Sequence, residues 1–238
     1  MLSYFSKTNI EKTFIAKILI ANPFTTNQMP PKPKTDAQRQ QLRTLIIDAA
    51  RALFVARGVD AVTMREIAKR IDYSPTSIYL HFADKESLIR AICDTDFLAL
   101  ASSLKVILQI PHPVERMHAL GRGYAAFALS HPNHYRLMFM TEHPPIDPEK
   151  SSLQQNNAEQ DAYFQLKSVV MEVHDADYFR PDLHDVDLIA QTIWAGIHGV
   201  CSLQITMADD KWVNWADVTA RLDLMQQMMT HGLLRRAD

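Results

Sequence analysis

The chain has 238 residues, of which 47% are hydrophobic and 22% are charged, so it can bury a sizeable core and is unlike an intrinsically disordered protein. Its 6 glycines argue against glycine-rich all-β and collagen-like folds, and its 2 cysteines cannot form a disulfide framework but suit a reducing cytosol. The formal net charge is -2, so any contact with nucleic acid requires a local basic surface.

Charge is distributed unevenly along the chain. Residues 30–90 contain 11 Lys and Arg against 7 Asp and Glu, whereas residues 91–238 contain 11 against 19. The first segment is therefore net basic and the second is net acidic. A basic segment ahead of an acidic body indicates that residues 30–90 meet a polyanion.

Residues 1–35 are expected to form a flexible extension outside the folded domains. The stretch Phe14–Ala21 has the apolar character of a signal-peptide core, but Lys17 interrupts it and a small-residue cleavage site is not clear. Met29 also begins a plain cytosolic N-terminus, whose prolines cannot enter a helix interior. The sequence contains no run of about 18 uncharged apolar residues, so no membrane span is predicted. We therefore expect a cytoplasmic protein.

Helical periodicity begins after the proline-rich segment. Apolar residues from Leu42 to Phe54 recur at i, i+3, i+4 and their continuation, which places them on one helical face. Gly58 then stands where a helix commonly ends in the left-handed conformation. The pattern predicts a first helix that ends at this glycine.

Two short helices are predicted next. Thr63 and Glu66 form the T-x-x-E capping box, which predicts a helix that ends before Asp72, where the chain must turn sharply. Ser74 is placed to cap the following helix, and Pro75 fits its first turn because no amide hydrogen is needed there. A connection of about three residues between two such helices is typical of a helix-turn-helix.

The rest of the chain is also predicted to be helical. Asp84 is placed to cap a longer helix that runs to about Leu108, before Pro111. Further helices are predicted over residues 113–130, 132–141, 155–176, 183–207 and 214–235. The predicted fold is therefore all-α with about nine helices. It comprises a three-helix N-terminal domain with a helix-turn-helix over 36–84 and a larger helical domain over 85–238.

The second helix of a helix-turn-helix lies in the major groove, with the residues near its N-terminus against base edges. Ser74, Pro75, Thr76 and Ser77 have short side chains, so this helix end can approach the bases closely. The hydroxyls of Thr76 and Ser77 suit base edges or phosphates. We therefore expect these four residues to contact DNA.

Other polar residues flank the predicted reading helix. Tyr79 and His81 can donate hydrogen bonds to phosphates, and Arg65 on the preceding helix can reach a base or a phosphate. Lys85 lies in the first turn of the next helix, where helix-end amides and a cation can share one phosphate. Spacing alone also fits a plain helical corner with a few polar residues.

Four segments occur in order along the chain: Ala49–Phe54, Gly58, Thr63–Ala68 and Ser74–Leu88. Together they resemble the DNA-binding domain of TetR-type transcriptional regulators, over about residues 45–90. The resemblance implies a homodimer that binds a palindromic operator on double-stranded DNA, and a small-molecule effector in the C-terminal domain that usually releases it. It assigns backbone or base contacts to Thr63, Arg65, Thr76, Ser77, Tyr79, His81 and Lys85. Asp72 stands where family members often have Gly, and since Asp tolerates the left-handed conformation we expect the turn to survive.

The C-terminal part resembles one TetR subclass, marked by the pattern Trp-x-x-x-His-Gly. The resemblance rests on Ile193–Val200 and, more weakly, on His131–Phe139. Trp194 and His198 are four residues apart and so share one helical face. The candidate effector-binding residues are Tyr124, Phe127, Tyr135, Phe139, Trp194 and His198. The same residues also suit a plain core, with His198 satisfied by a carbonyl.

The last two predicted helices carry apolar stripes at helical spacing. These stripes could form a four-helix seam with a symmetry mate, or they could pack inside one chain. The dimer is preferred because the resembled family pairs through its last two long helices. The candidate interface residues are Ile189, Ile193, Ile197, Leu222, Met225, Met229 and Leu233.

No cofactor or metal is expected. His131 and His134 are three residues apart, which permits shared metal ligation, but a site needs three or four convergent ligands. Cys93 and Cys201 are either redox sensors or buried, inert thiols.

Two other classes of function fit the sequence less well. An enzyme is not expected, because no nucleophile motif, phosphate-binding glycine loop or H-E-x-x-H motif occurs. The alternative is a helical dimer scaffold that has lost DNA binding. The intact Tyr79, His81 and Lys85 argue against it.

Overall fold

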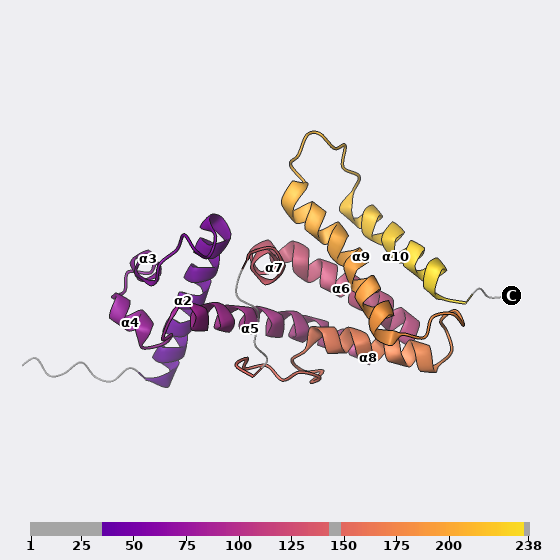
Figure 1. The fold of residues 1–238 in the computed structure, drawn as a ribbon, viewed down its shortest axis with the longest axis horizontal. Helices are drawn as coiled ribbons and strands as arrows, with labels where there is room; N and C mark the ends of the chain where they lie inside the picture. The colour runs from indigo at the N-terminus through magenta and orange to yellow at the C-terminus, as the bar shows by residue number, and fades with distance from the viewer. Residues whose placement is uncertain (1–34, 143–148, 236–238) are drawn as a thin grey trace, which may run out of the picture. The chain divides into compact units, whose positions relative to one another are not determined.

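The computed structural model describes residues 35–142 and 149–235. Within these ranges it contains nine α-helices, one 3-10 helix and no strand, so the predicted all-α fold is confirmed (Figure 1). The helices in chain order are α2 (Asp36–Arg57), α3 (Met64–Arg70), α4 (Pro75–Tyr79), α5 (Lys85–Leu104), η1 (Lys105–Gln109), α6 (Pro113–Ser130), α7 (Pro132–Phe139), α8 (Ala162–Asp175), α9 (Val186–Met207) and α10 (Val218–Leu233).

The chain divides into two units, residues 1–41 and residues 42–238. Helix α2 begins in the first unit and continues into the second. Except for Thr35, the flexible extension expected over 1–35 lies outside the described residues. The predicted domain boundary after residue 84 stays a prediction.

Local signals set the ends of the first helices. Gly58, with a φ of 80°, follows the last residue of α2. Thr63 and Glu66 form both hydrogen bonds of the capping box at the start of α3. Ser74 accepts a hydrogen bond at the start of α4, and Asp84 does the same for α5. These predicted caps are confirmed.

Helix α8 is shorter than predicted. The periodicity predicted a helix over 155–176, but the helix begins at Ala162. Asp161 caps it by accepting a hydrogen bond from the amide of Phe164. The residues before it form turns, in one of which Asn156 has a φ of 60°. Residues 155–161 are polar except for Ala158, so they favour turns over a helix with an apolar face.

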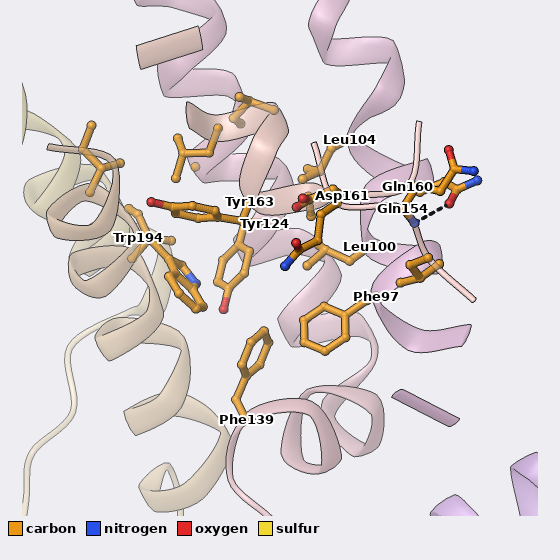
Figure 2. Close-up of a pocket in the computed structure, with 18 of the residues that line it drawn as sticks. Phe97, Leu100, Leu104, Tyr124, Phe139, Gln154, Gln160, Asp161, Tyr163 and Trp194 are labelled. Atoms are coloured by element: carbon orange, nitrogen blue, oxygen red, sulfur yellow. Dashed lines mark hydrogen bonds between the residues drawn. The ribbon is translucent and has the colours of Figure 1, made fainter. Parts of the chain in front are cut away.

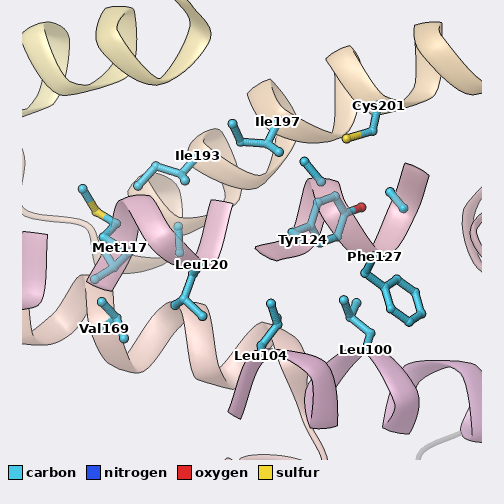
Figure 3. Packing of buried hydrophobic residues seen from close by; sticks show 14 of the residues in the cluster. Leu100, Leu104, Met117, Leu120, Tyr124, Phe127, Val169, Ile193, Ile197 and Cys201 are labelled. Atoms are coloured by element: carbon cyan, nitrogen blue, oxygen red, sulfur yellow. The ribbon is translucent and has the colours of Figure 1, made fainter. Parts of the chain in front are cut away.

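Two hydrophobic clusters form the core of residues 42–238. The N-terminal cluster packs α2, α3, α4 and the first half of α5 around Phe54, Ile67 and Ile78. The C-terminal cluster packs the rest of α5 with α6, α8 and α9, around residues such as Tyr124 and Ile193 (Figure 3). Helices α5 and α7 both contribute to the two clusters: on α7, Leu137 lies in the N-terminal cluster and Tyr135 in the C-terminal one.

Helix α9 is, among the described residues, the one helix long and apolar enough to cross a membrane by length and composition. It packs against α6, α8 and α10, and it buries Ile189, Ile193 and Ile197 in the C-terminal cluster. These contacts are those of a core helix.

Candidate functional site

Helices α3 and α4 meet in a helix-turn-helix that turns at Asp72. Asp72 has a φ of 58°, and its amide donates to the carbonyl of Lys69 at 3.3 Å. The next amide, of Tyr73, donates to the carbonyl of Ala68 at 3.0 Å. Asp thus adopts the left-handed conformation at this position, as expected, and the turn is closed by backbone hydrogen bonds.

The N-terminal end of α4 is presented to solvent. Ser74, Pro75 and Thr76 are exposed, whereas Ile78 is fully buried in the N-terminal cluster and holds the helix in place. The Ser74 hydroxyl accepts a hydrogen bond from the amide of Ser77 at 3.2 Å, and the two hydroxyls lie 2.9 Å apart. Ser77 is therefore partly engaged in the cap, while Thr76 points its short side chain outward.

Three further predicted DNA contacts lie around this helix end. Tyr79 is half exposed and Arg65 is exposed on α3, while His81 is partly buried. Thr63 is exposed, but its hydroxyl donates to Glu66 at 2.9 Å as part of the cap. The structure thus brings the predicted residues to one helix pair, with Thr63 also holding α3.

Lys85 is held by the chain itself, which the sequence did not indicate. Its ammonium donates to the carbonyl of Val59 at 2.9 Å and to the carbonyl of Val62 at 3.3 Å. These two carbonyls belong to the segment between α2 and α3. An ammonium has three N–H groups, so one remains for a phosphate. The predicted phosphate contact stays a prediction, and the structure adds a second role, which is to position the start of α3.

A cavity of about 260 Å³ lies beside the C-terminal cluster. Helices α5, α6, α7, α8 and α9 contribute to its wall, together with residues from the irregular segment 151–161 (Figure 2). Among the predicted effector-binding residues, Tyr124, Phe139 and Trp194 line it.

The other three candidates do not line the cavity. Phe127 is buried in the C-terminal cluster, where it stacks on His131 with ring centroids 4.9 Å apart. Tyr135 is fully buried, and its hydroxyl contacts His198 instead of the cavity. The aromatic pattern identified the cluster correctly but could not tell which rings face the space and which face the packed side.

A small polar network lies behind the cavity wall. The hydroxyls of Tyr124 and Tyr135 lie 2.9 Å and 2.7 Å from Nδ1 of His198. Burial lowers the pKa of His198 and raises the pKa of Tyr124 to about 12. The network is therefore uncharged at neutral pH, and it joins α6, α7 and α9. His198 is satisfied mainly by phenol hydroxyls rather than by the carbonyl that the core interpretation expected.

Within the single chain, the apolar stripes predicted to form a dimer seam lie against the C-terminal cluster, and the predicted interface stays a prediction. Each isoleucine of the α9 stripe is exposed by 5% or less, and the α10 stripe packs against the same core. The residues of this predicted interface are the buried Ile189, Ile193 and Ile197 and the partly buried Leu222, Met225, Met229 and Leu233. Gly196 permits this packing, since a Cβ there would lie 3.1 Å from the sulfur of Met225. An apolar stripe has the same spacing in either setting, so the sequence could not separate them.

The opposite faces of α9 and α10 remain exposed. They carry large apolar side chains at Leu188, Leu203, Leu224 and Met228, each exposed by at least 42%. Gly199 also has no neighbouring atom within 4 Å of the place where a Cβ would stand. Sequence reasoning missed this surface because its residues alternate with polar ones.

The cysteines and histidines singled out by the sequence do not form a reactive site. Cys93 and Cys201 are buried, and burial raises the pKa of Cys93 to about 12 and that of Cys201 to about 11. Thiols of this kind stay protonated and inert. His131 and His134 stack edge to face at 5.3 Å, and over residues 35–142 and 149–235 no group of three potential metal ligands occurs.

Sequence reasoning also missed one wall of the cavity. Ser151 donates its hydroxyl to Asp94 on α5 at 2.7 Å. Ser152 donates both its amide and its hydroxyl to the other oxygen of Asp94, each at 2.7 Å. The segment at 151–152 therefore lies against α5 because a buried carboxylate holds it. A charged residue inside an apolar helix was the available signal.

Asp96, two residues further along α5, holds α2. It is fully buried and accepts hydrogen bonds from Nε and Nη2 of Arg51 on α2, at 3.0 Å and 2.6 Å. Nδ1 of His134 on α7 lies 3.1 Å from the same carboxylate. This bidentate pair fixes α2 to α5.

Comparisons with known proteins agree with both parts of the chain. A model of bacterial regulatory proteins of the tetR family matches residues 46–92, and a tetracyclin repressor-like C-terminal domain model matches residues 117–225. The HTH-type transcriptional repressor KstR2 of Mycobacterium tuberculosis is 30% identical over 163 residues, which are 64% of this chain and 78% of that protein. The HTH-type transcriptional regulator UidR of Escherichia coli is 33% identical over 81 residues, 34% of this chain and 38% of that protein. The crystal structure of a TetR family transcription regulator from Marinobacter aquaeolei VT8 superposes with a TM-score of 0.67 at 17% identity. The match covers 85% of this chain and all of that one, so the two proteins share a fold.

Proposed function

The chain belongs to the tetR family of bacterial regulatory proteins and is a DNA-binding transcriptional regulator, and we propose that it acts as a repressor. We also propose that it is cytoplasmic and that it is not an enzyme. The observation that carries the proposal is the exposed N-terminal end of α4, set on a buried Ile78 and framed by two capped helices. A relative of 30% identity is named a repressor, which supports repression over activation. The pattern of Trp194, His198 and Gly199 supports the Trp-x-x-x-His-Gly subclass.

We assign base contacts to the exposed end of α4 and phosphate contacts to the residues around it. Pro75 and Thr76 are exposed short side chains at the helix end, so they suit base edges. Tyr79, His81 and Arg65 suit the backbone on either side. Lys85 contributes through its position at the start of α5 and through the loop that it holds.

Selection of bound fragments from genomic DNA by the purified protein tests this function. The expected result is a palindromic sequence bound in the nanomolar range. The slope of log affinity against log salt is negative, and Arg65→Ala should make it less steep by about 0.9 if Arg65 contacts one phosphate. Arg180→Ala, on an exposed side chain far along the sequence, is the matched control and should leave the slope unchanged. A scaffold that has lost DNA binding would select no fragment.

We propose that the homodimer forms through the exposed faces of α9 and α10. One recognition helix reads only a few base pairs, so two related by a twofold axis are needed for adequate specificity. Leu188, Leu203, Leu224 and Met228 supply apolar surface for such a contact.

Two negative charges introduced on that face test whether it forms the dimer interface. The Leu224→Asp, Met228→Asp double variant should sediment as a monomer and bind the operator weakly. Met171→Asp, on a comparably exposed methionine of α8, should remain dimeric. A dimer that survives the double variant would place the interface elsewhere.

We propose that an effector in the cavity releases the operator. The cavity wall includes α5, and α5 also holds α2 through Asp96. An effector can act only if it binds the operator-competent and operator-incompetent states with different affinity. The protein should therefore lose operator affinity when its effector is added at saturation, and unchanged affinity would contradict the mechanism.

A further inference from the structure

We propose that the C-terminal cavity takes an uncharged molecule of about two fused rings with a hydroxyl or carbonyl at one end, and that it discriminates against carboxylates and phosphates. This inference rests on the proposed role of the cavity as the effector site. It adds the chemical class of the effector, which follows from the size, the walls and the charges of the cavity.

The size of the cavity sets the size of the ligand. An apolar protein cavity of about 150 Å³ can hold one benzene ring. The cavity here has about 260 Å³, which is slightly under the usual range for drug-sized ligands. A bicyclic molecule fills such a space, whereas a single ring would leave much of the wall without contact.

Apolar and aromatic side chains form most of the wall. The rings of Phe139 and Trp194 meet edge to face, with centroids 5.9 Å apart, and Phe97 meets Phe139 in the same way at 5.6 Å. Such a set offers both ring faces and ring edges to a ligand ring. In Figure 2 these rings lie on one side of the space, and Gln154 and Gln160 lie on the other.

Among the described residues that line the cavity, none is Lys or Arg. Two lysines near the wall are already in ion pairs: Lys167 of α8 with Asp187 at 2.8 Å, and Lys105 of η1 with Glu159. The one charged lining residue is Asp161, whose negative charge opposes an anion. A bound carboxylate would lose its water without gaining a counter-charge.

Asp161 is also a poor partner for a cationic ligand. One of its oxygens accepts a hydrogen bond from the amide of Phe164 at 2.9 Å, and the other accepts one from the amide of Asn156 at 3.1 Å. The carboxylate is therefore used to cap α8 and is partly compensated by the helix terminus. An uncharged ligand requires no such partner.

Amide side chains mark the polar end. Gln155 and Gln160 line the cavity. The side-chain carbonyl of Gln160 accepts a hydrogen bond from the backbone amide of Gln154 at 2.9 Å, which leaves the side-chain NH₂ group of Gln160 to donate. Uncharged amides both donate and accept, so they suit a hydroxyl or a carbonyl. The polar end of the ligand therefore lies at the segment 151–160.

Three probes that share one bicyclic frame test the inference: naphthalenemethanol, naphthoate and naphthylmethyl-trimethylammonium. Their binding to the full chain is measured by titration calorimetry at pH 7. We expect the alcohol to bind at least about tenfold more tightly than either charged probe, because only the charged ones lose hydration without compensation. Equal or tighter binding of a charged probe, or no binding of the alcohol, overturns the inference.

A gain-of-function variant tests the charge argument separately. Gln155 is exposed at the cavity mouth, so Gln155→Lys should fold and supply the missing counter-charge. We expect naphthoate to bind this variant several-fold more tightly. Gln41→Lys, at an exposed position on α2 that does not line the cavity, is the matched control. An unchanged naphthoate affinity in Gln155→Lys would overturn the charge argument.

Operator release is measured apart from binding. If the alcohol binds but operator affinity does not change, the ligand class stands and the proposed effector mechanism fails. If operator DNA is bound but the alcohol is not, the regulator stands and the ligand class fails.

Discussion

Removal of the Asp96 carboxylate breaks the ion pair that joins α2 to α5, together with the contact to Nδ1 of His134. In Asp96→Ala the guanidinium of Arg51, exposed by only 5%, loses two hydrogen bonds, at 3.0 Å and 2.6 Å. Asp48 remains as a partner at 2.7 Å, but its side chain is 60% exposed. The variant therefore leaves a buried cation with one solvent-facing partner.

The expected loss follows from these contacts. Breaking a buried ion pair on one side costs about 3–5 kcal/mol, and the remaining Asp48 contact places Asp96→Ala near about 3 kcal/mol. For a domain of this size that corresponds to a melting temperature lower by roughly 6–12 °C. The double variant Arg51→Met, Asp96→Leu removes both charges, and it should recover the stability of the parent protein or exceed it.

Urea unfolding followed by circular dichroism measures the effect, provided that the m-value is unchanged. Glu159→Gln is the matched control, because it breaks an ion pair with Lys105 whose side chains are 56% and 62% exposed, and it should cost at most about 1 kcal/mol. A loss of less than about 1 kcal/mol in Asp96→Ala, or a double variant as unstable as the single one, would refute the reasoning.

Three further outcomes are expected. The hydrogen bond from the Thr63 amide, with help from Arg57, lowers the pKa of Glu66 from 4.5 to about 2, so the unfolded chain binds the proton first and stability falls as pH drops below 4.5; urea midpoints against pH should fall less steeply in Glu66→Gln than in the parent. Burial lowers the pKa of His198 from 6.5, so stability should also fall as pH drops below 6.5; because burial lowers the pKa of His118 as well, this fall should be smaller in His198→Asn than in the parent, and an equal fall would contradict the assignment. Gly196→Ala forces methionine sulfurs at 3.1 Å and 3.2 Å to shift, whereas Gly199→Ala meets nothing within 4 Å and should stabilise the isolated chain by about 0.5–1 kcal/mol; melting temperatures in the opposite order would refute the packing of α9 on α10.

The sequence predicted those features whose causes are local. A cap or a left-handed turn depends on residues within about four positions of one another, so Thr63, Ser74, Asp84 and Gly58 could be assigned directly. The helix-turn-helix followed from the caps and the spacing between them. The exposed end of α4 could be predicted for the same reason.

Features that depend on distant contacts could not be predicted. The ammonium of Lys85 contacts carbonyls more than twenty positions earlier in the chain. The stripe at Ile189 has the same spacing whether it faces a partner or its own core. The cavity wall at Ser151 comes from a segment without periodicity, fixed only by a carboxylate on another helix.

The two aspartates of α5 attach this helix to two different parts of the chain. Residues two positions apart on an α-helix point about 200° apart around its axis. Asp94 binds Ser151 and Ser152 beside the cavity on one side of α5, and Asp96 binds Arg51 of α2 on the other. Under the proposed effector mechanism, a ligand that displaces Ser151 and Ser152 would act on the same helix that holds α2.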